Sequence, residues 1–215
     1  MTVGVVPLEG RGSLPFVDLH HEPLFLHAVR ALLDVEPLAG RVVVTAEPDH
    51  IARAAAELVR ADLDVPVQDA DRWWAGLTGS LTVVLHDPLC PLVPARFLTG
   101  CLAERRTGSG PDETPALVAF RPVTDTIKTV IDERIVDTLD RDRFGIVASP
   151  VVFDHDGDGD RPVSTEDFAA LATWLRGRGP VSLRKAPSLG RRVDDPSAVN
   201  LLECMDEMAH AVRES

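Results

Sequence analysis

The chain has 215 residues, of which 45% are hydrophobic and 26% charged, a composition typical of a globular protein with a substantial core. Its 34 acidic residues outnumber 22 basic ones, and a net charge of −12 argues against nucleic acid or an anionic membrane as a partner. There is no run of about 18 apolar residues, no N-terminal secretory leader and no C-x-x-C pair among the three cysteines, so we expect a cytoplasmic protein with no membrane-spanning helix.

Apolar strands and helical stretches alternate along the first half of the chain. Strands are predicted at residues 3–7, 41–46, 65–67 and 81–85, and helices at 22–34, 51–61, 71–77 and 93–105. Near-continuous apolar strands that alternate with helices predict a mostly parallel sheet covered on both faces, that is, a Rossmann-like three-layer α/β sandwich. Ligands of such sheets bind at the carboxyl ends of the strands.

The second half of the chain has a different pattern of residues. After an exposed loop at 107–114 and a strand at 116–120, two β-branched segments at 124–130 and 134–139 predict an extended hairpin. A strand at 144–149, a polar loop at 154–160, a helix at 165–178, a strand at 181–184 and a helix at 196–214 complete the chain. Ser164 or Thr165 is the expected N-cap of the helix at 165–178. We expect residues 1–215 to form one domain.

The first strand runs into a Gly10-x-Gly12 turn. Bare backbone N–H groups in such a turn can hold a phosphate, although a tight turn also needs glycine for its backbone freedom alone. Arg11 is the only cation at this turn, because neither lysine nor arginine occurs between Gly12 and Arg30. The neighbouring carboxylate of Glu9 would repel a phosphate. The turn is therefore poorly equipped for triphosphate chemistry, which needs cations close by.

Asp87 follows the strand at 81–85 and lies at the same predicted edge of the sheet as the Gly10-x-Gly12 turn. Its carboxylate could bind Mg²⁺ together with phosphate oxygens, or it could cap the turn before Pro88.

Other candidate sites have plainer interpretations. The acidic loop at Asp154–Asp160 imitates the start of a calcium loop, but it has Thr165 at the twelfth position and no clear preceding helix, so a solvated loop is preferred. His20, His21 and His27 are expected to be structural or surface residues rather than metal ligands. The pair Trp73-Trp74 is expected to be one core residue and a partly exposed neighbour, with a base-stacking platform as the alternative.

Short motifs in a fixed order carry a resemblance to a known family. These are Val5-Val6-Pro7-x-x-Gly10-x-Gly12, His86-Asp87-x-x-x-Pro91, Pro122-Val123-Thr124-Asp125-Thr126-Ile127-Lys128, Thr138-x-Asp140-Arg141, Thr165-Glu166-Asp167 and Val193-Asp194-x-Pro196. The chain resembles the methylerythritol phosphate cytidylyltransferases of isoprenoid biosynthesis over nearly its whole length. Members of this family transfer a cytidylyl group from CTP to a polyol phosphate, release pyrophosphate and use a divalent metal. They are homodimers locked by a protruding β-arm.

The resemblance also implies roles for individual residues. Residues from about 119 to 141 would form the arm, whose Thr126 and Arg141 hold the substrate phosphate in the partner subunit's site. Thr165 would be a further substrate contact. Nucleotide binding would fall to Gly10, Arg11, Gly12 and Asp87, with Asp87 also on Mg²⁺, and Arg192 stands where the family has a lysine.

The departures from the family pattern fall on the nucleotide side. Residues 13–16 replace a longer segment that carries an arginine and a lysine, Cys90 stands for another arginine, and the base-reading segment becomes Gln68–Trp74. Loss of one preorganised charge contact commonly costs about 10²–10³ in rate, so we expect cytidylyl transfer to be weak or lost. The chain is then a divergent nucleotidyltransferase, with Asp87 and Arg192 as catalytic residues, or a non-catalytic dimeric homologue that acts as a binding or regulatory subunit. A third reading is a binder of another nucleotide or phosphorylated small molecule.

Overall fold

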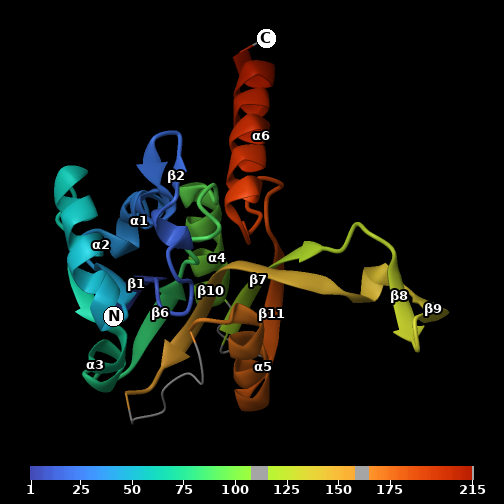
Figure 1. Ribbon diagram of the computed structural model, residues 1–215. Helices are drawn as coiled ribbons and strands as arrows, with labels where there is room; N and C mark the ends of the chain where they lie inside the picture. The colour runs from blue at the N-terminus through green and yellow to red at the C-terminus, as the bar shows by residue number, and fades with distance from the viewer. Residues whose placement is uncertain (108–115, 158–164, 215) are drawn as a thin grey trace.

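The computed structural model describes residues 1–107, 116–157 and 165–214, and its centre is a seven-stranded sheet with the order β11-β7-β10-β6-β1-β4-β5 (Figure 1). These strands are β1 (Thr2–Pro7), β4 (Val42–Ala46), β5 (Val67–Asp69), β6 (Leu81–Leu85), β7 (Ala116–Pro122), β10 (Gly145–His155) and β11 (Val181–Lys185). β10 is antiparallel to both of its neighbours, whereas every other pairing in this sheet is parallel. The predicted mostly parallel sheet is confirmed.

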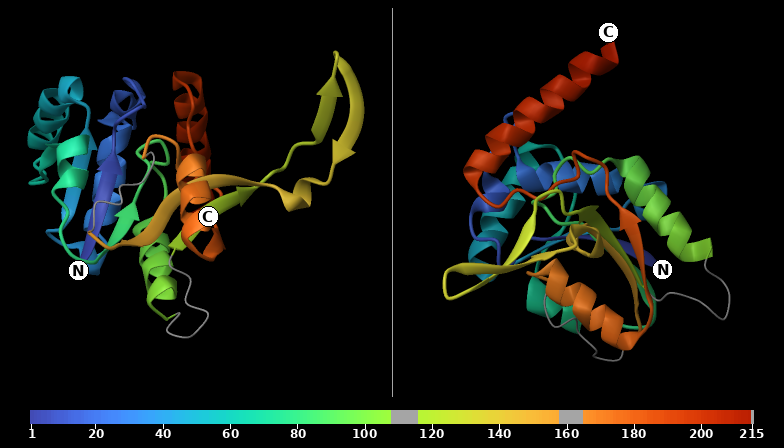
Figure 2. Two further views of the ribbon diagram at one scale, coloured as in Figure 1. Left: turned by 90° about the horizontal axis from the view of Figure 1, so that it is seen from below. Right: turned by 90° about the vertical axis from the view of Figure 1, so that its right-hand side faces the viewer.

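Helices cover both faces of the sheet because alternate strand residues point to opposite sides (Figure 2). Val6 and Val44 pack on one face with α1 (Leu24–Leu33), α2 (Pro48–Arg60) and α4 (Ala95–Thr107). Val5 and Val43 pack on the other face with α3 (Ala70–Ala75) and α5 (Phe168–Arg178). The result is the expected three-layer, Rossmann-like α/β architecture.

A two-stranded arm projects from this body (Figures 1 and 2). β8 (Ile127–Ile131) pairs with β9 (Arg134–Leu139), and both turn residues between them, Asp132 and Glu133, have positive φ, as in the turns that join tight hairpins. β7 and β10 stay paired as far as Pro122 and Gly145, so the arm comprises residues 123–144 and includes the 3₁₀ turn η3 (Arg141–Arg143). The arm thus begins four residues and ends three residues later than the predicted range of about 119–141.

The start of α5 differs from the prediction. The helix begins at Phe168, and the carboxylate of its N-cap Asp167 accepts hydrogen bonds from the amides of Ala169 and Ala170. Thr165 precedes the helix and its hydroxyl donates to Glu9, and Ser164 lies outside the described residues. The expected caps, Ser164 or Thr165, are therefore wrong.

The last helix, α6 (Pro196–Glu214), extends away from the body (Figure 1). Val199 and Leu202 at its base pack in a small cluster with Leu19, Leu24 and Leu89. Two short strands, β2 (Asp18–Leu19) and β3 (Glu22–Pro23), lie between the 3₁₀ turn η1 (Leu14–Phe16) and α1; the turn η2 (Glu36–Leu38) leads from α1 into β4. No helix in the described part of the chain has the length and apolarity to cross a membrane.

Candidate functional site

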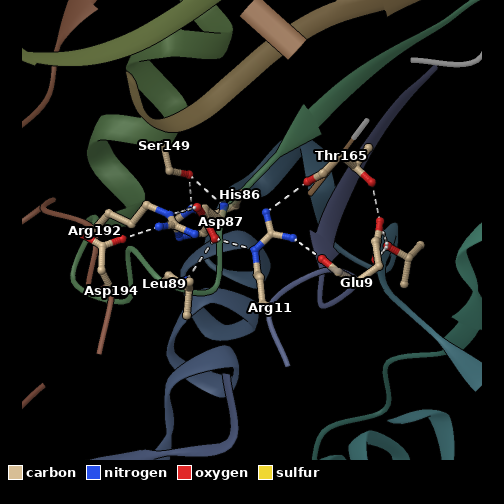
Figure 3. Close-up of polar contacts among 10 residues, drawn as sticks. Glu9, Arg11, His86, Asp87, Leu89, Ser149, Thr165, Arg192 and Asp194 are labelled. Atoms are coloured by element: carbon tan, nitrogen blue, oxygen red, sulfur yellow. Dashed lines mark hydrogen bonds and ion pairs between the residues drawn. The ribbon is translucent and has the colours of Figure 1, made fainter. Parts of the chain in front are cut away.

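Segments that follow the carboxyl ends of β1 and β6 meet at one edge of the sheet, as predicted (Figure 3). We call residues 8–12, after β1, the Gly10 loop. Arg11 from this loop, Asp87 after β6, Thr165 before α5 and Arg192 before α6 form one connected group of side chains. The structure therefore brings together four of the predicted site residues that lie far apart in the sequence.

The carboxylate of Asp87 is buried between two guanidinium groups. Its Oδ1 accepts from Arg11 Nε at 2.9 Å and from the Leu89 amide at 3.1 Å, and its Oδ2 accepts from Arg192 Nε at 3.0 Å. Burial by itself would raise the pKa of Asp87, but Arg11, Arg192 and the Leu89 amide outweigh it and hold the pKa below its usual value. Asp87 is thus ionised, and the guanidinium groups of Arg11 and Arg192 balance its charge.

The guanidinium of Arg11 is bonded to groups of the chain itself, which places it poorly for binding a nucleotide phosphate. Its side chain is 1% exposed, and its terminal nitrogens donate to the carbonyl oxygens of Glu9 at 2.7 Å and Thr165 at 3.0 Å. One guanidinium thereby joins the Gly10 loop, Asp87 and the segment before α5. The placement does not fit the predicted role of Arg11 as a phosphate ligand.

Glu9 is held by two hydroxyl groups. Its buried carboxylate accepts hydrogen bonds from the hydroxyl groups of Thr45, at 3.0 Å, and Thr165. These bonds tie the Gly10 loop to the end of β4 on one side and to residue 165 on the other. Glu9 therefore joins three segments of the chain at this edge of the sheet, and its predicted repulsion of a phosphate stays a prediction.

The backbone amide of Gly10 is also occupied, here by a carboxylate of the chain itself. Gly10 has a φ of +70°, and its N–H donates to Glu47 Oε1 at 3.1 Å. A Cβ atom at Gly10 would lie 2.5 Å from Cγ of Glu166, so this second acidic side chain covers the other side of the glycine. Sequence reasoning missed both glutamates, although Glu47 follows directly on a predicted strand whose carboxyl end had to lie at this edge.

Ser149 and His86 fix the loop that carries Asp87. Ser149 Oγ accepts from the Asp87 amide at 2.9 Å and lies 2.5 Å from His86 Nδ1. Complete burial lowers the pKa of His86 to about 4 despite the nearby charge of Asp87, so the imidazole is neutral near pH 7. Ser149 was not predicted, because it belongs to β10, whose antiparallel course gives no signal in the sequence.

A cavity of about 300 Å³ remains beside this group, lined by Asp87, Ile146, Val147, Ala148, Glu166, Asp167, Phe168, Ala169 and Arg192. Arg192 is its partly exposed cation, with a side chain that is 36% exposed and also paired with Asp194. Its lining includes Glu166, the side chain that also packs against Gly10. We call it the Arg192 cavity.

Thr126 and Arg141 lie outside this group, on the exposed arm (Figure 2). Arg141 donates to the carbonyl oxygen of Thr124 at 2.6 Å within the arm. A contribution from either residue to a site of this kind would have to be made to a second copy of the chain.

The residues at Asp87 do not fit a divalent cation in this arrangement. Both carboxylate oxygens already accept from guanidinium groups, and the two positive charges would repel a metal ion. Within the ranges that the structure describes, no group of three or more histidine, cysteine, aspartate or glutamate residues is placed to hold a metal ion. In the acidic loop at 154–160, Asp154 bonds to Thr82 and Arg105, and residues 158–160 lie outside the described part.

The remaining candidates have structural roles. His27 Nε2 lies 2.9 Å from the carbonyl oxygen of Leu19, and His20 contacts Glu203 and Asp206 of α6. Trp73 and Trp74 are both buried in the sheet core, so neither is the partly exposed neighbour that was expected.

Comparisons with known proteins agree with this architecture. The family model described as 2-C-methyl-D-erythritol 4-phosphate cytidylyltransferase matches residues 11–157. The chain is 32% identical over 173 residues to the Corynebacterium diphtheriae protein of that name, in a match that covers 71% of this chain and 68% of the relative. It is 27% identical over 154 residues to the Carboxydothermus hydrogenoformans protein, with 67% and 64% covered.

Solved structures show the same fold. The 4-diphosphocytidyl-2C-methyl-D-erythritol synthase of Anaerococcus prevotii superimposes with a TM-score of 0.73 at 12% identity, covering 96% of both chains. The 2-C-methyl-D-erythritol 4-phosphate cytidylyltransferase of Thermus thermophilus has a TM-score of 0.64 at 20% identity, covering 95% of this chain and 98% of the other. These alignments span nearly the whole chain and show its fold, and the family model and the sequence matches show that the chain belongs to the 2-C-methyl-D-erythritol 4-phosphate cytidylyltransferase family.

Proposed function

We propose that this chain is a homodimeric member of its family in which cytidylyl transfer from CTP is weak or lost, and that it acts as a binding or regulatory subunit. One observation carries the proposal: in the Gly10 loop, which the resemblance assigns to the nucleotide, the chain's own groups already bond the Gly10 amide and Arg11. The buried Arg11 donates to Asp87 and to two carbonyl oxygens, and the Gly10 amide is bonded to Glu47.

A triphosphate would meet an unfavourable charge distribution here. Glu47 and Glu166 flank Gly10, while Arg11 is buried beneath the loop with its charge balanced by Asp87. Preorganised cations contribute about 10²–10³ each to the rates of such reactions, and the penalties for losing several need not multiply. Even a single loss of this size would leave the activity far below that of an intact enzyme.

The Arg192 cavity supports binding of a small phosphorylated molecule. Its volume of about 300 Å³ is at the lower end of the range for ligand pockets. Arg192 offers a guanidinium, which suits phosphate geometry. In a dimer, Thr126 and Arg141 of a second copy are available to complete this site, as the resemblance implies.

Isothermal titration calorimetry of the chain with CTP and Mg²⁺ tests the proposal. We expect no saturable heat under conditions in which the Corynebacterium diphtheriae relative, run in parallel, serves as the positive control. Saturable binding together with metal-dependent release of pyrophosphate from CTP in the presence of an acceptor would contradict the proposal. That result would instead support the alternative, a divergent but active nucleotidyltransferase with Mg²⁺ at Asp87.

The dimer is tested separately. Val130 and Ile135 face each other in the register of the arm hairpin and are 57% and 66% exposed, an apolar surface that a second copy would cover. We expect the wild type to sediment as a dimer and the double variant Val130→Asp/Ile135→Asp as a monomer. Val59→Asp, which changes a 78% exposed valine on α2, is the matched control and should stay dimeric. A wild type that sediments as a monomer would refute the arm-mediated dimer.

A further inference from the structure

Glu47 immediately precedes α2, and its side chain turns away from that helix. It is the N-cap of α2, yet its side chain makes no capping hydrogen bond to that helix. The carboxylate reaches across to the Gly10 loop, where Oε1 accepts from the Gly10 amide at 3.1 Å. The side chain at the start of the helix therefore serves the Gly10 loop and places an anion there.

Two separate groups converge on this carboxylate. Gly10 N–H meets Oε1, and His50 Nδ1 lies 3.3 Å from Oε2. The ring of His50 is held in place against Phe16, with their centroids 5.4 Å apart. A loop amide and a fixed imidazole thus form a small cradle for one anion, and the carboxylate in it is 45% exposed. The cradle is within reach of solvent.

We propose that the Gly10 amide and His50 form an anion-binding site that this chain fills with its own Glu47 carboxylate, so that removal of this carboxylate admits inorganic phosphate. The inference rests on the proposed function, in which the chain's own groups occupy the Gly10 loop, and it identifies Glu47 as the group that occupies the Gly10 amide. Glu47 is a tethered competitor: it satisfies the amide that a phosphate oxygen would otherwise accept from, and it repels any second anion.

The test is titration of inorganic phosphate into the wild type, Glu47→Ala and Glu36→Ala at pH 7 and low salt, followed by calorimetry. Glu36 is the matched control, because it is an exposed glutamate that precedes the opposite, amino end of β4. We expect phosphate to bind Glu47→Ala at least about tenfold more tightly than the wild type, the factor that corresponds to one charge-assisted hydrogen bond. Glu36→Ala should behave as the wild type does.

A second readout separates this site from a general effect of charge. In ¹H–¹⁵N spectra, the Gly10 amide resonance should move on substitution of Glu47 and should move again when phosphate is added to Glu47→Ala. The double variant Glu47→Ala/His50→Gln should lose most of the gain in affinity.

Phosphate that binds Glu47→Ala no better than the control, or an unresponsive Gly10 resonance, would overturn the inference. Failure of the proposed function is distinguishable, because it would show as CTP binding to the wild type.

Discussion

Replacement of Arg11 by methionine separates a structural role for this residue from a role in nucleotide binding. Methionine retains an unbranched apolar stem but removes the guanidinium, which leaves Asp87 buried with Arg192 as its remaining cationic partner. The side chains of Arg11 and Asp87 are 1% and 3% exposed. Removal of one partner from so deeply buried a pair typically costs about 3–5 kcal/mol. We expect Arg11→Met to lower the free energy of unfolding by that amount.

Arg192→Met is the matched comparison. This arginine contacts the same carboxylate at nearly the same distance, but its side chain is 36% exposed and solvent screens the interaction. Its loss should therefore cost only about 1 kcal/mol. Urea denaturation at pH 7, followed by tryptophan fluorescence, measures both variants.

The dependence of the free energy of unfolding on pH tests the role of Arg11 a second time. The pKa of Asp87 is lowered in the folded state, so its contribution is complete above the unfolded pKa and is lost as the pH falls through the folded value. The difference between Arg11→Met and the wild type should accordingly shrink in acid. If Arg11→Met proves no more costly than Arg192→Met and alters only CTP binding, Arg11 is a nucleotide ligand and the assignment made here is refuted.

Three further predictions concern the same framework. Burial lowers the pKa of His86 to about 4, so the unfolded chain takes up a proton between pH 6.5 and 4 that the folded chain does not. The free energy of unfolding should therefore fall by about 3 kcal/mol over that interval. His86→Gln should flatten this part of a plot of urea stability against pH, and an unchanged slope would contradict the prediction. Asp167→Ala should lower the free energy of unfolding by about 1 kcal/mol, because it removes the cap of α5, and an unaffected urea midpoint would count against that cap. A thiol reagent should modify the exposed Cys204 rapidly in the native protein and reach Cys90 and Cys101 only after denaturation. Both of these cysteines are buried, and burial raises the pKa of Cys101 to about 12. Fast labelling of more than one thiol in the native protein would show that this packing is wrong.

Much of the fold could be predicted because its signals are local. The strands around Val5 and Val43 are short apolar runs between helical stretches, and that alternation dictates a mostly parallel sheet. The hairpin of the arm follows from β-branched segments on either side of Asp132-Glu133. What escaped prediction was the antiparallel β10, because neither composition nor periodicity records the direction in which a strand runs.

The site was predictable in position but not in connectivity. The rule that ligands bind at the carboxyl ends of strands placed Gly10 and Asp87 together. The ion pair between Arg11 and Asp87 joins residues 76 positions apart, and no local pattern indicates that a loop arginine points inward. The cap of α5 was misplaced for a related reason: Ser164, Thr165 and Asp167 are all good caps by residue type, and the sequence does not record that the Thr165 hydroxyl bonds to the distant Glu9.

The course of β10 has a mechanical consequence. The strand leaves the arm at Gly145, and only four residues further on it carries Ser149, whose hydroxyl holds the loop of Asp87 in place. The pairing of β10 with β7 shifts register between Val147 and Val151, so the strand is irregular over this same stretch. A displacement of the arm would therefore act on the same strand that carries Ser149. If two copies pair through their arms, as proposed above, that pairing and the position of Asp87 depend on one continuous stretch of backbone.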